Sequence, residues 1–138
     1  MPATSGLSHI TLICRDLDRM EEILIGVMGA QKLYDSGAEG FSIAEERFYD
    51  IGGVWLAVMK GESLAARSYN HIAFKVTDDD LDAARTAIER LGLELRPPRP
   101  RVPGEGRSLY FYDADNHLFE LHTGTLEERL ARYHQGKA

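Results

Sequence analysis

Residues 8–16 read SHITLICRD, and residues 70–78 repeat the pattern as NHIAFKVTD. A second pair of runs follows in the same order, FYDIGGVWLAV at residues 48–58 and FYDADNHLFEL at residues 111–121. Both members of each pair place polar, apolar and turn-forming residues in the same succession. Self-similarity of this kind predicts that a unit of about 60 residues occurs twice in the chain.

Each unit begins with alternating apolar and polar residues, the pattern of a strand with two different faces. Apolar residues at helical spacing follow, and Gly29 and Gly92 stand where a left-handed residue would end each helix. We expect Asp18 to cap the first helix, with Glu21 as its capping-box partner. Three short strands then complete each unit, near residues 32–34, 47–50 and 54–59 and near residues 94–96, 108–112 and 118–122. The predicted element order is therefore βαβββ, twice.

The expected fold class is α+β. Paired βαβββ units are expected to form an open, cupped mixed β-sheet around a metal site, with the helices on the convex side. One domain is expected over residues 1–138, with repeats at about 6–62 and 68–124 and a C-terminal helix at about 125–134. Residues 96–107 contain four prolines, which exclude a regular helix there. This segment is either a solvated connection or an ordered loop over a site.

Composition narrows the classes of function. With 43% hydrophobic and 28% charged residues, the chain is neither disordered nor a coiled coil. The 22 acidic and 16 basic residues give a net charge of −6, which does not favour a nucleic-acid partner. No apolar run reaches the roughly 18 residues of a membrane helix, and no secretory signal opens the chain. Cys14 is the only cysteine, so we expect a reducing, cytoplasmic location.

Strand alternation predicts a metal site. The apolar residues that directly follow His9 and Thr11 should face the helix, which leaves these two side chains on the other face. The repeat places His71 equivalently, and Glu120 lies on the same face of the last strand. Two imidazoles, one carboxylate and open positions suit a divalent metal that also binds substrate. A single histidine is more often a hydrogen-bonded core residue, but the repetition favours ligands; His122 also faces this cavity, as a replacement ligand or a supporting group.

Long motifs resemble the fosfomycin-resistance proteins of the vicinal oxygen chelate (glyoxalase/extradiol dioxygenase) superfamily over nearly the whole chain. They are GLSHITL at residues 6–12, YNHIAF at 69–74, GEGRSLYFYD at 104–113 and DNHLFELHTGTLEERL at 115–130. The run FSIAEERF at residues 41–48 resembles the branch that opens the substrate with water. The resemblance implies a metal-dependent epoxide hydrolase that converts fosfomycin into an inactive vicinal diol.

The resemblance also implies roles for single residues. Glu46 matches the general base of the water-using branch, although alternation alone allows either Glu45 or Glu46 to face the site. The implied metal is manganese, held by His9, His71 and Glu120. The implied substrate-binding residues are Thr11, Tyr69, Arg107, Ser108, Tyr110 and Arg129. A homodimer that shares each metal site between its chains is implied as well, whereas the potassium-binding loop of the glutathione branch is not reproduced.

Three other functions share parts of this pattern. A fosfomycin thiol transferase of the glutathione or bacillithiol type would use the same metal ligands. A drug-binding protein of the superfamily would protect stoichiometrically and would lack those ligands. An isomerase or ring-cleaving dioxygenase would keep the ligands but would not need Glu46 together with the phosphonate-binding residues.

Overall fold

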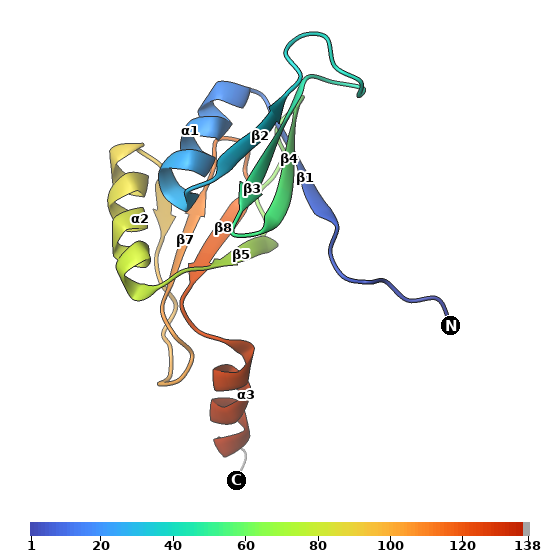
Figure 1. Ribbon diagram of the computed structural model, residues 1–138. Coiled ribbons are helices and arrows are strands. Elements are labelled where there is room, and N and C mark those ends of the chain that lie inside the picture. Colours follow the sequence, from blue (N-terminus) through green and yellow to red (C-terminus); the bar gives the residue numbers. More distant parts are fainter. Residues whose placement is uncertain (137–138) are drawn as a thin grey trace. The chain divides into compact units, whose positions relative to one another are not determined.

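The computed structural model of the chain describes residues 1–136 (Figure 1). Its elements are, in order, β1 (His9–Cys14), α1 (Leu17–Met28), β2 (Gln31–Asp35), β3 (Glu46–Ile51), β4 (Val54–Lys60), β5 (His71–Lys75), α2 (Asp78–Arg90), β6 (Glu94–Arg96), β7 (Ser108–Tyr112), β8 (Leu118–His122) and α3 (Leu126–Gln135). This order is βαβββ twice, followed by a C-terminal helix. The predicted α+β class is confirmed.

The chain divides into two compact units, each with one four-stranded mixed sheet. The first unit comprises residues 1–66 and 114–116, and the second comprises residues 67–113 and the chain from residue 117 onward. The strand order is β1-β4-β3-β2 in the first unit and β5-β8-β7-β6 in the second. In both units the first strand runs parallel to the last, and the other neighbours are antiparallel. That both units form a single domain stays a prediction.

In each unit one helix packs its apolar side against the sheet, whose strands supply most of the other buried residues. In the first unit the buried residues of α1 are Leu17, Met20, Ile23, Leu24 and Val27. In the second unit the buried residues of α2 are Leu81, Ala84, Ala87 and Ile88. Each of these helices packs on its own sheet (Figure 1). The third helix differs, because no residue of α3 is buried.

The first helix begins two residues earlier than the sequence predicts. Its N-cap is Asp16, whose carboxylate accepts hydrogen bonds from the backbone N–H groups of Asp18 and Arg19. The expectation that Asp18 is the cap is wrong. Asp18 instead pairs with the Arg47 guanidinium at 2.8 Å, an interaction between α1 and β3 that local spacing could not indicate. Gly29 ends the helix with a φ of 64°, as expected.

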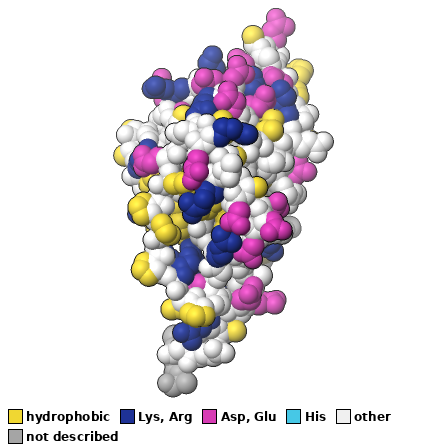
Figure 2. Space-filling view, turned by 90° about the vertical axis from the view of Figure 1, so that its left-hand side faces the viewer, with side chains coloured by type: hydrophobic (Ala, Val, Ile, Leu, Met, Phe, Trp, Pro, Cys, Tyr) yellow, Lys and Arg dark blue, Asp and Glu magenta, His cyan; other side chains and the backbone are white. Residues whose placement is uncertain are grey.

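The surface carries both signs of charge. On the face that Figure 2 shows, basic and acidic side chains are interspersed and do not form one continuous basic area. A phosphate backbone would need such an area. None of the helices within residues 1–136 combines the length and the apolar character that crossing a bilayer requires.

Candidate active site

The second unit places a row of polar side chains on the sheet face away from α2. Glu120 of β8 lies opposite Ala73 of β5 and Tyr110 of β7, and Ser108 lies opposite His122. The intervening residues of β8, Phe119 and Leu121, are fully buried on the other side. Alternation along the strands therefore sends the apolar residues into the core and the polar ones to a common face.

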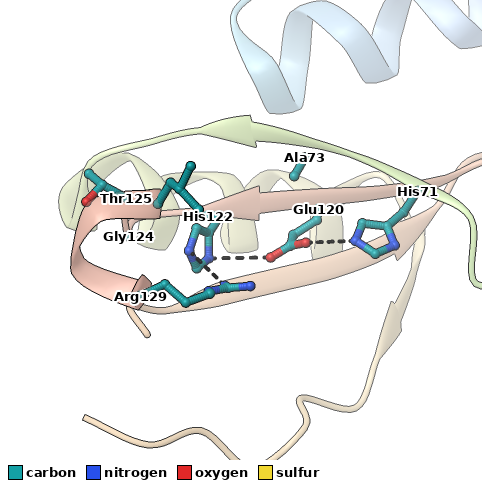
Figure 3. Close-up of a pocket in the computed structure, with 8 residues that line it drawn as sticks. His71, Ala73, Glu120, His122, Gly124, Thr125 and Arg129 are labelled. Carbon is teal, nitrogen blue, oxygen red and sulfur yellow. Dashed lines mark hydrogen bonds and ion pairs between the residues drawn. The ribbon is translucent and has the colours of Figure 1, made fainter. Parts of the chain in front are cut away.

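This face borders a pocket of about 330 Å³ (Figure 3). Its lining residues are His71, Ala73, Glu120, His122, Gly124, Thr125, Leu126 and Arg129. Thr125 caps α3 by accepting the N–H of Glu128, and this start of the helix brings Arg129 to the pocket one turn later. The Arg129 side chain reaches His122, with Nη2 at 3.3 Å from Nε2. The predicted residues His71, Glu120 and Arg129 thus lie together.

His71 and Glu120 meet in a way that suits a metal ion. The Nδ1 atom of His71 lies 2.7 Å from the Tyr69 carbonyl oxygen, which can only accept, so Nδ1 carries the proton. In the neutral ring, Nε2 then points a lone pair at Glu120 Oε1, 3.0 Å away. Adjacent ligands of an octahedral ion with bonds of about 2.1 Å lie about 3 Å apart. The two side chains therefore fit a shared divalent cation.

The third predicted ligand, His9, belongs to the first unit. It stacks on Trp55 with ring centroids 4.2 Å apart, and its Nδ1 lies 2.9 Å from the Ser8 hydroxyl. Within residues 1–136, no three or more His, Cys, Asp or Glu side chains are grouped as a metal cage. The second unit thus joins two of the three predicted ligands.

The register of the first sheet distinguishes Glu46 from Glu45. Thr11 and Phe48 both pair with Ala57, so their side chains lie on the same face of the sheet. Glu46 lies two residues before Phe48 on the same strand and therefore points to that face too. Arg47 and the residues in phase with it contact α1 on the other face. Glu45 lines a separate hollow at the start of α1. Glu46 therefore lies on the His9 face of its sheet, which alternation alone had left open.

Two tyrosines stand beside the His71–Glu120 pair. The ring of Tyr69 lies 4.9 Å from that of His71 and 6.0 Å from that of Tyr110, measured between centroids. Burial, the hydrogen bond with Tyr69 and the negative charge of Glu120 raise the pKa of Tyr110 to about 12. The Tyr110 phenol is therefore protonated at neutral pH and can donate a hydrogen bond.

Arg107 does not reach this pocket. Its guanidinium pairs with Asp78 at 3.0 Å and with Asp82 at 2.8 Å, both on α2. Because Ser108 faces the pocket, the residue before it points to the helix side of the sheet. This arrangement is at odds with the predicted contact between Arg107 and a phosphonate.

Glu105 organises the loop before β7. It is 4% exposed, accepts the Val102 N–H, and binds Arg99 at 2.6 Å and the Tyr133 hydroxyl of α3 at 3.0 Å. The Val102 N–H and the Arg99 guanidinium are the main causes that lower the pKa of Glu105 to about 2. The segment is therefore an ordered loop tied to α3, the second of the two interpretations that the sequence allowed.

The low pKa of Glu105 predicts a pH-dependent stability. A carboxyl whose pKa is lower in the folded state stabilises the fold above its unfolded pKa of 4.5, and this contribution is lost as the pH falls toward 2. We expect urea unfolding to show Glu105→Gln less stable than the wild type at pH 7, with the gap narrowing below pH 4.5. Glu127→Gln, at an exposed position of α3, is the control and should track the wild type. A constant gap from pH 7 to pH 3 would contradict the prediction.

Comparison with known proteins agrees with this geometry. The family model of the Glyoxalase/Bleomycin resistance protein/Dioxygenase superfamily matches residues 6–121. The chain belongs to this superfamily. Within the superfamily it is 61% identical to the fosfomycin resistance protein FosX of Mesorhizobium japonicum, over 95% of this chain and 94% of that protein. It is 44% identical to the metallothiol transferase FosB of Shouchella clausii, over 94% of this chain and 87% of that protein.

A solved structure matches nearly the whole chain. It is a variant of FosX from Listeria monocytogenes, crystallised with Mn(II) and 1S,2S-dihydroxypropylphosphonic acid. The TM-score is 0.86 and the sequence identity is 52%, with 96% of this chain and 100% of that chain covered.

Sequence analysis of this superfamily member missed Arg101. Its Nη2 donates to the Tyr110 hydroxyl at 3.1 Å and lies 3.6 Å from Glu120 Oε2. Its Nη1 is buried 3.8 Å from Glu105 Oε2, too far for a hydrogen bond, and has no hydrogen-bond acceptor among the described residues. A buried cationic N–H of this kind suits an anionic ligand. Arginines in the proline-rich loop were the available signal, but only the folded loop shows which of them turns inward.

Proposed function

We propose that the chain is a Mn²⁺-dependent hydrolase that adds water to the oxirane of fosfomycin and gives an inactive vicinal diol. The observation that carries the proposal is the pair His71 and Glu120 beside the guanidinium groups of Arg101 and Arg129. A metal-binding pair next to two cations suits a substrate with a phosphonate beside an epoxide. The high identity to FosX, and the dihydroxypropylphosphonic acid in the FosX crystal, support this substrate and product.

The metal and the phosphonate have separate sets of residues in this proposal. Mn²⁺ held by His9, His71 and Glu120 would supply a Lewis acid for the epoxide oxygen. Arg129, Arg101 and the hydroxyl groups of Tyr110, Thr11 and Ser108 bind the phosphonate by charge-assisted hydrogen bonds, and the Tyr69 ring closes the side of the site.

Glu46 is the general base of the proposed reaction. Its carboxylate takes a proton from a water molecule while the water oxygen bonds to an oxirane carbon and the carbon–oxygen bond of the ring breaks. The released alkoxide then takes up a proton from solvent and Glu46 returns its own proton to solvent, so both oxygens end as hydroxyl groups. The face that Glu46 shares with His9 and Thr11 supports this role.

The complete site is proposed to form in a homodimer, in which paired βαβββ units of two chains share each metal ion. The division of the ligands between units supports this assembly, because His71 and Glu120 belong to one compact unit and His9 to the other. Several apolar side chains also remain exposed on the single chain, among them Trp55, Leu126 and Leu130. We place the protein in the cytoplasm, where the thiol of Cys14, the single cysteine of the sequence, stays reduced.

A fosfomycin thiol transferase is the second candidate, because FosB is also a relative. To separate the two, purified protein is incubated with Mn²⁺ and fosfomycin without any thiol, and products are followed by phosphorus NMR. We expect the diol to form at a rate that glutathione or bacillithiol does not increase. Turnover that begins only when a thiol is added would support the transferase, and stoichiometric protection without turnover would support a drug-binding protein.

A further inference from the structure

The two carboxylate oxygens of Glu120 have different surroundings. Oε1 faces His71 Nε2 at 3.0 Å, whereas Oε2 accepts the Ser108 hydroxyl at 2.6 Å. The Ser108 oxygen also lies 2.7 Å from His122 Nδ1, which is itself 3.4 Å from Glu120 Oε2. On the other side of the ring, His122 Nε2 lies 3.3 Å from Arg129 Nη2. Figure 3 shows Glu120 between the two imidazoles, with the Arg129 guanidinium beside His122. Four side chains from β7, β8 and α3 thus form one chain of contacts that ends on Oε2.

The chemistry of these groups allows one arrangement of protons. An ionised Glu120 can only accept, so the single hydroxyl proton of Ser108 must point at Oε2. Ser108 must then accept from His122, which places the imidazole proton on Nδ1. Arg129 can only donate, and it therefore needs the lone pair that this tautomer leaves on Nε2. Neutral, Nδ1-protonated His122 satisfies every contact in this series from Arg129 to Glu120. The other neutral tautomer would break the contact with Arg129 and would force Ser108 to donate either to His122 or to Glu120, but not to both.

We propose that His122 is a positioning residue, which acts through Ser108 to hold Glu120 so that only Oε1 is offered to the metal. The inference rests on the proposed metal site and goes beyond it, because it assigns the tautomer of His122 and the direction of the Ser108 proton. It also changes the part of Ser108. Ser108 has one hydroxyl proton, and it donates this proton to Glu120. To donate a hydrogen bond to a phosphonate oxygen instead, Ser108 would have to give up its hydrogen bond to Glu120.

The tautomer can be measured without metal or substrate. Nitrogen-15 NMR of the imidazole rings at pH 7 distinguishes a protonated Nδ1 from a protonated Nε2 and from the cation. We expect the ring of His122 to be neutral, with its proton on Nδ1. A His122 ring that carries its proton on Nε2, or that is a cation, would overturn the assignment.

The positioning role is tested by Mn²⁺ affinity, measured by electron paramagnetic resonance of the free ion. Groups that orient a metal ligand typically contribute 10–100-fold to affinity, so His122→Ala should weaken Mn²⁺ binding by about that factor. His122→Asn keeps an N–H donor near the position of Nδ1 and should recover most of the loss. His134→Ala should bind Mn²⁺ as the wild type does.

A double mutant separates this route from a general loss of structure. If His122 acts through Ser108, adding His122→Ala to Ser108→Ala should cost little further affinity, whereas independent effects would multiply. Equal Mn²⁺ affinity of the wild type and His122→Ala, or equal losses in His122→Ala and His122→Asn, would overturn the positioning role of His122 and leave the proposed metal site standing. Absence of Mn²⁺ binding by the wild type would instead remove the proposed metal site, and the NMR result would still decide the tautomer.

Discussion

Glu46→Gln is expected to lower kcat for fosfomycin hydrolysis by about 10²–10⁴-fold, the usual contribution of a well-placed general base. Glutamine has nearly the same size and shape as glutamate, but its amide cannot accept the proton of the attacking water. Mn²⁺ affinity should stay close to that of the wild type, because Glu46 is not among the proposed ligands. Diol formation followed by phosphorus NMR, together with Mn²⁺ titration, measures both quantities on the same preparation.

The neighbouring residue supplies a matched control. Glu45→Gln removes the same charge one position earlier in the chain, but this side chain lines the hollow at the start of α1. We expect Glu45→Gln to keep nearly the full kcat. Comparable losses in both variants would show that the negative charge of the segment matters and that neither residue is the base.

Glu120→Ala and His71→Ala are expected to have the second large effect, a loss of Mn²⁺ affinity of more than about 100-fold. Changes that only orient a ligand cost 10–100-fold, so removal of the ligand itself should exceed that range. Diol formation at a fixed, moderate Mn²⁺ concentration should fall in parallel. Isothermal titration with Mn²⁺, in the absence of fosfomycin, measures the affinity directly.

The control for these variants is His134→Ala, which removes an exposed imidazole of the same unit. It should bind Mn²⁺ with the affinity of the wild type. Because Glu120 is buried, Glu120→Gln serves as a second variant that preserves its volume, and circular dichroism checks that each protein is folded. Wild-type affinity in either His71→Ala or Glu120→Gln would contradict the ligand assignment.

Local sequence patterns were sufficient to predict the helices and strands. The repeated runs and the period-two alternation predict all eight strands, and Gly29 and Gly92 mark the ends of the first two helices, where both adopt positive φ. The capping residue of α1 was the exception. Asp16 and Asp18 are chemically equivalent as caps, and the choice between them depends on Arg47, which lies about 30 residues later and pairs with Asp18.

In the candidate site, too, local alternation placed some residues and only the tertiary structure placed others. Alternation along β5 and β8 was enough to put His71 and Glu120 on one face, because neighbouring side chains of a strand point to opposite sides. The same rule, applied to a segment with two adjacent carboxylates, could not choose between Glu45 and Glu46. The pairing of β3 with β4 makes that choice, since it ties Glu46 to the face of Thr11.

Residue order and composition thus define two βαβββ repeats, a net negative charge and a candidate metal-binding pair, since each depends on local periodicity or on counts of side chains. The fold itself is needed to turn Arg101 inward and Arg107 toward α2, and to join Arg129, His122 and Ser108 to Glu120. These contacts connect residues of separate strands, a loop and a helix. Their distances depend on sheet register, loop closure and helix capping together, and no short stretch of sequence contains all three.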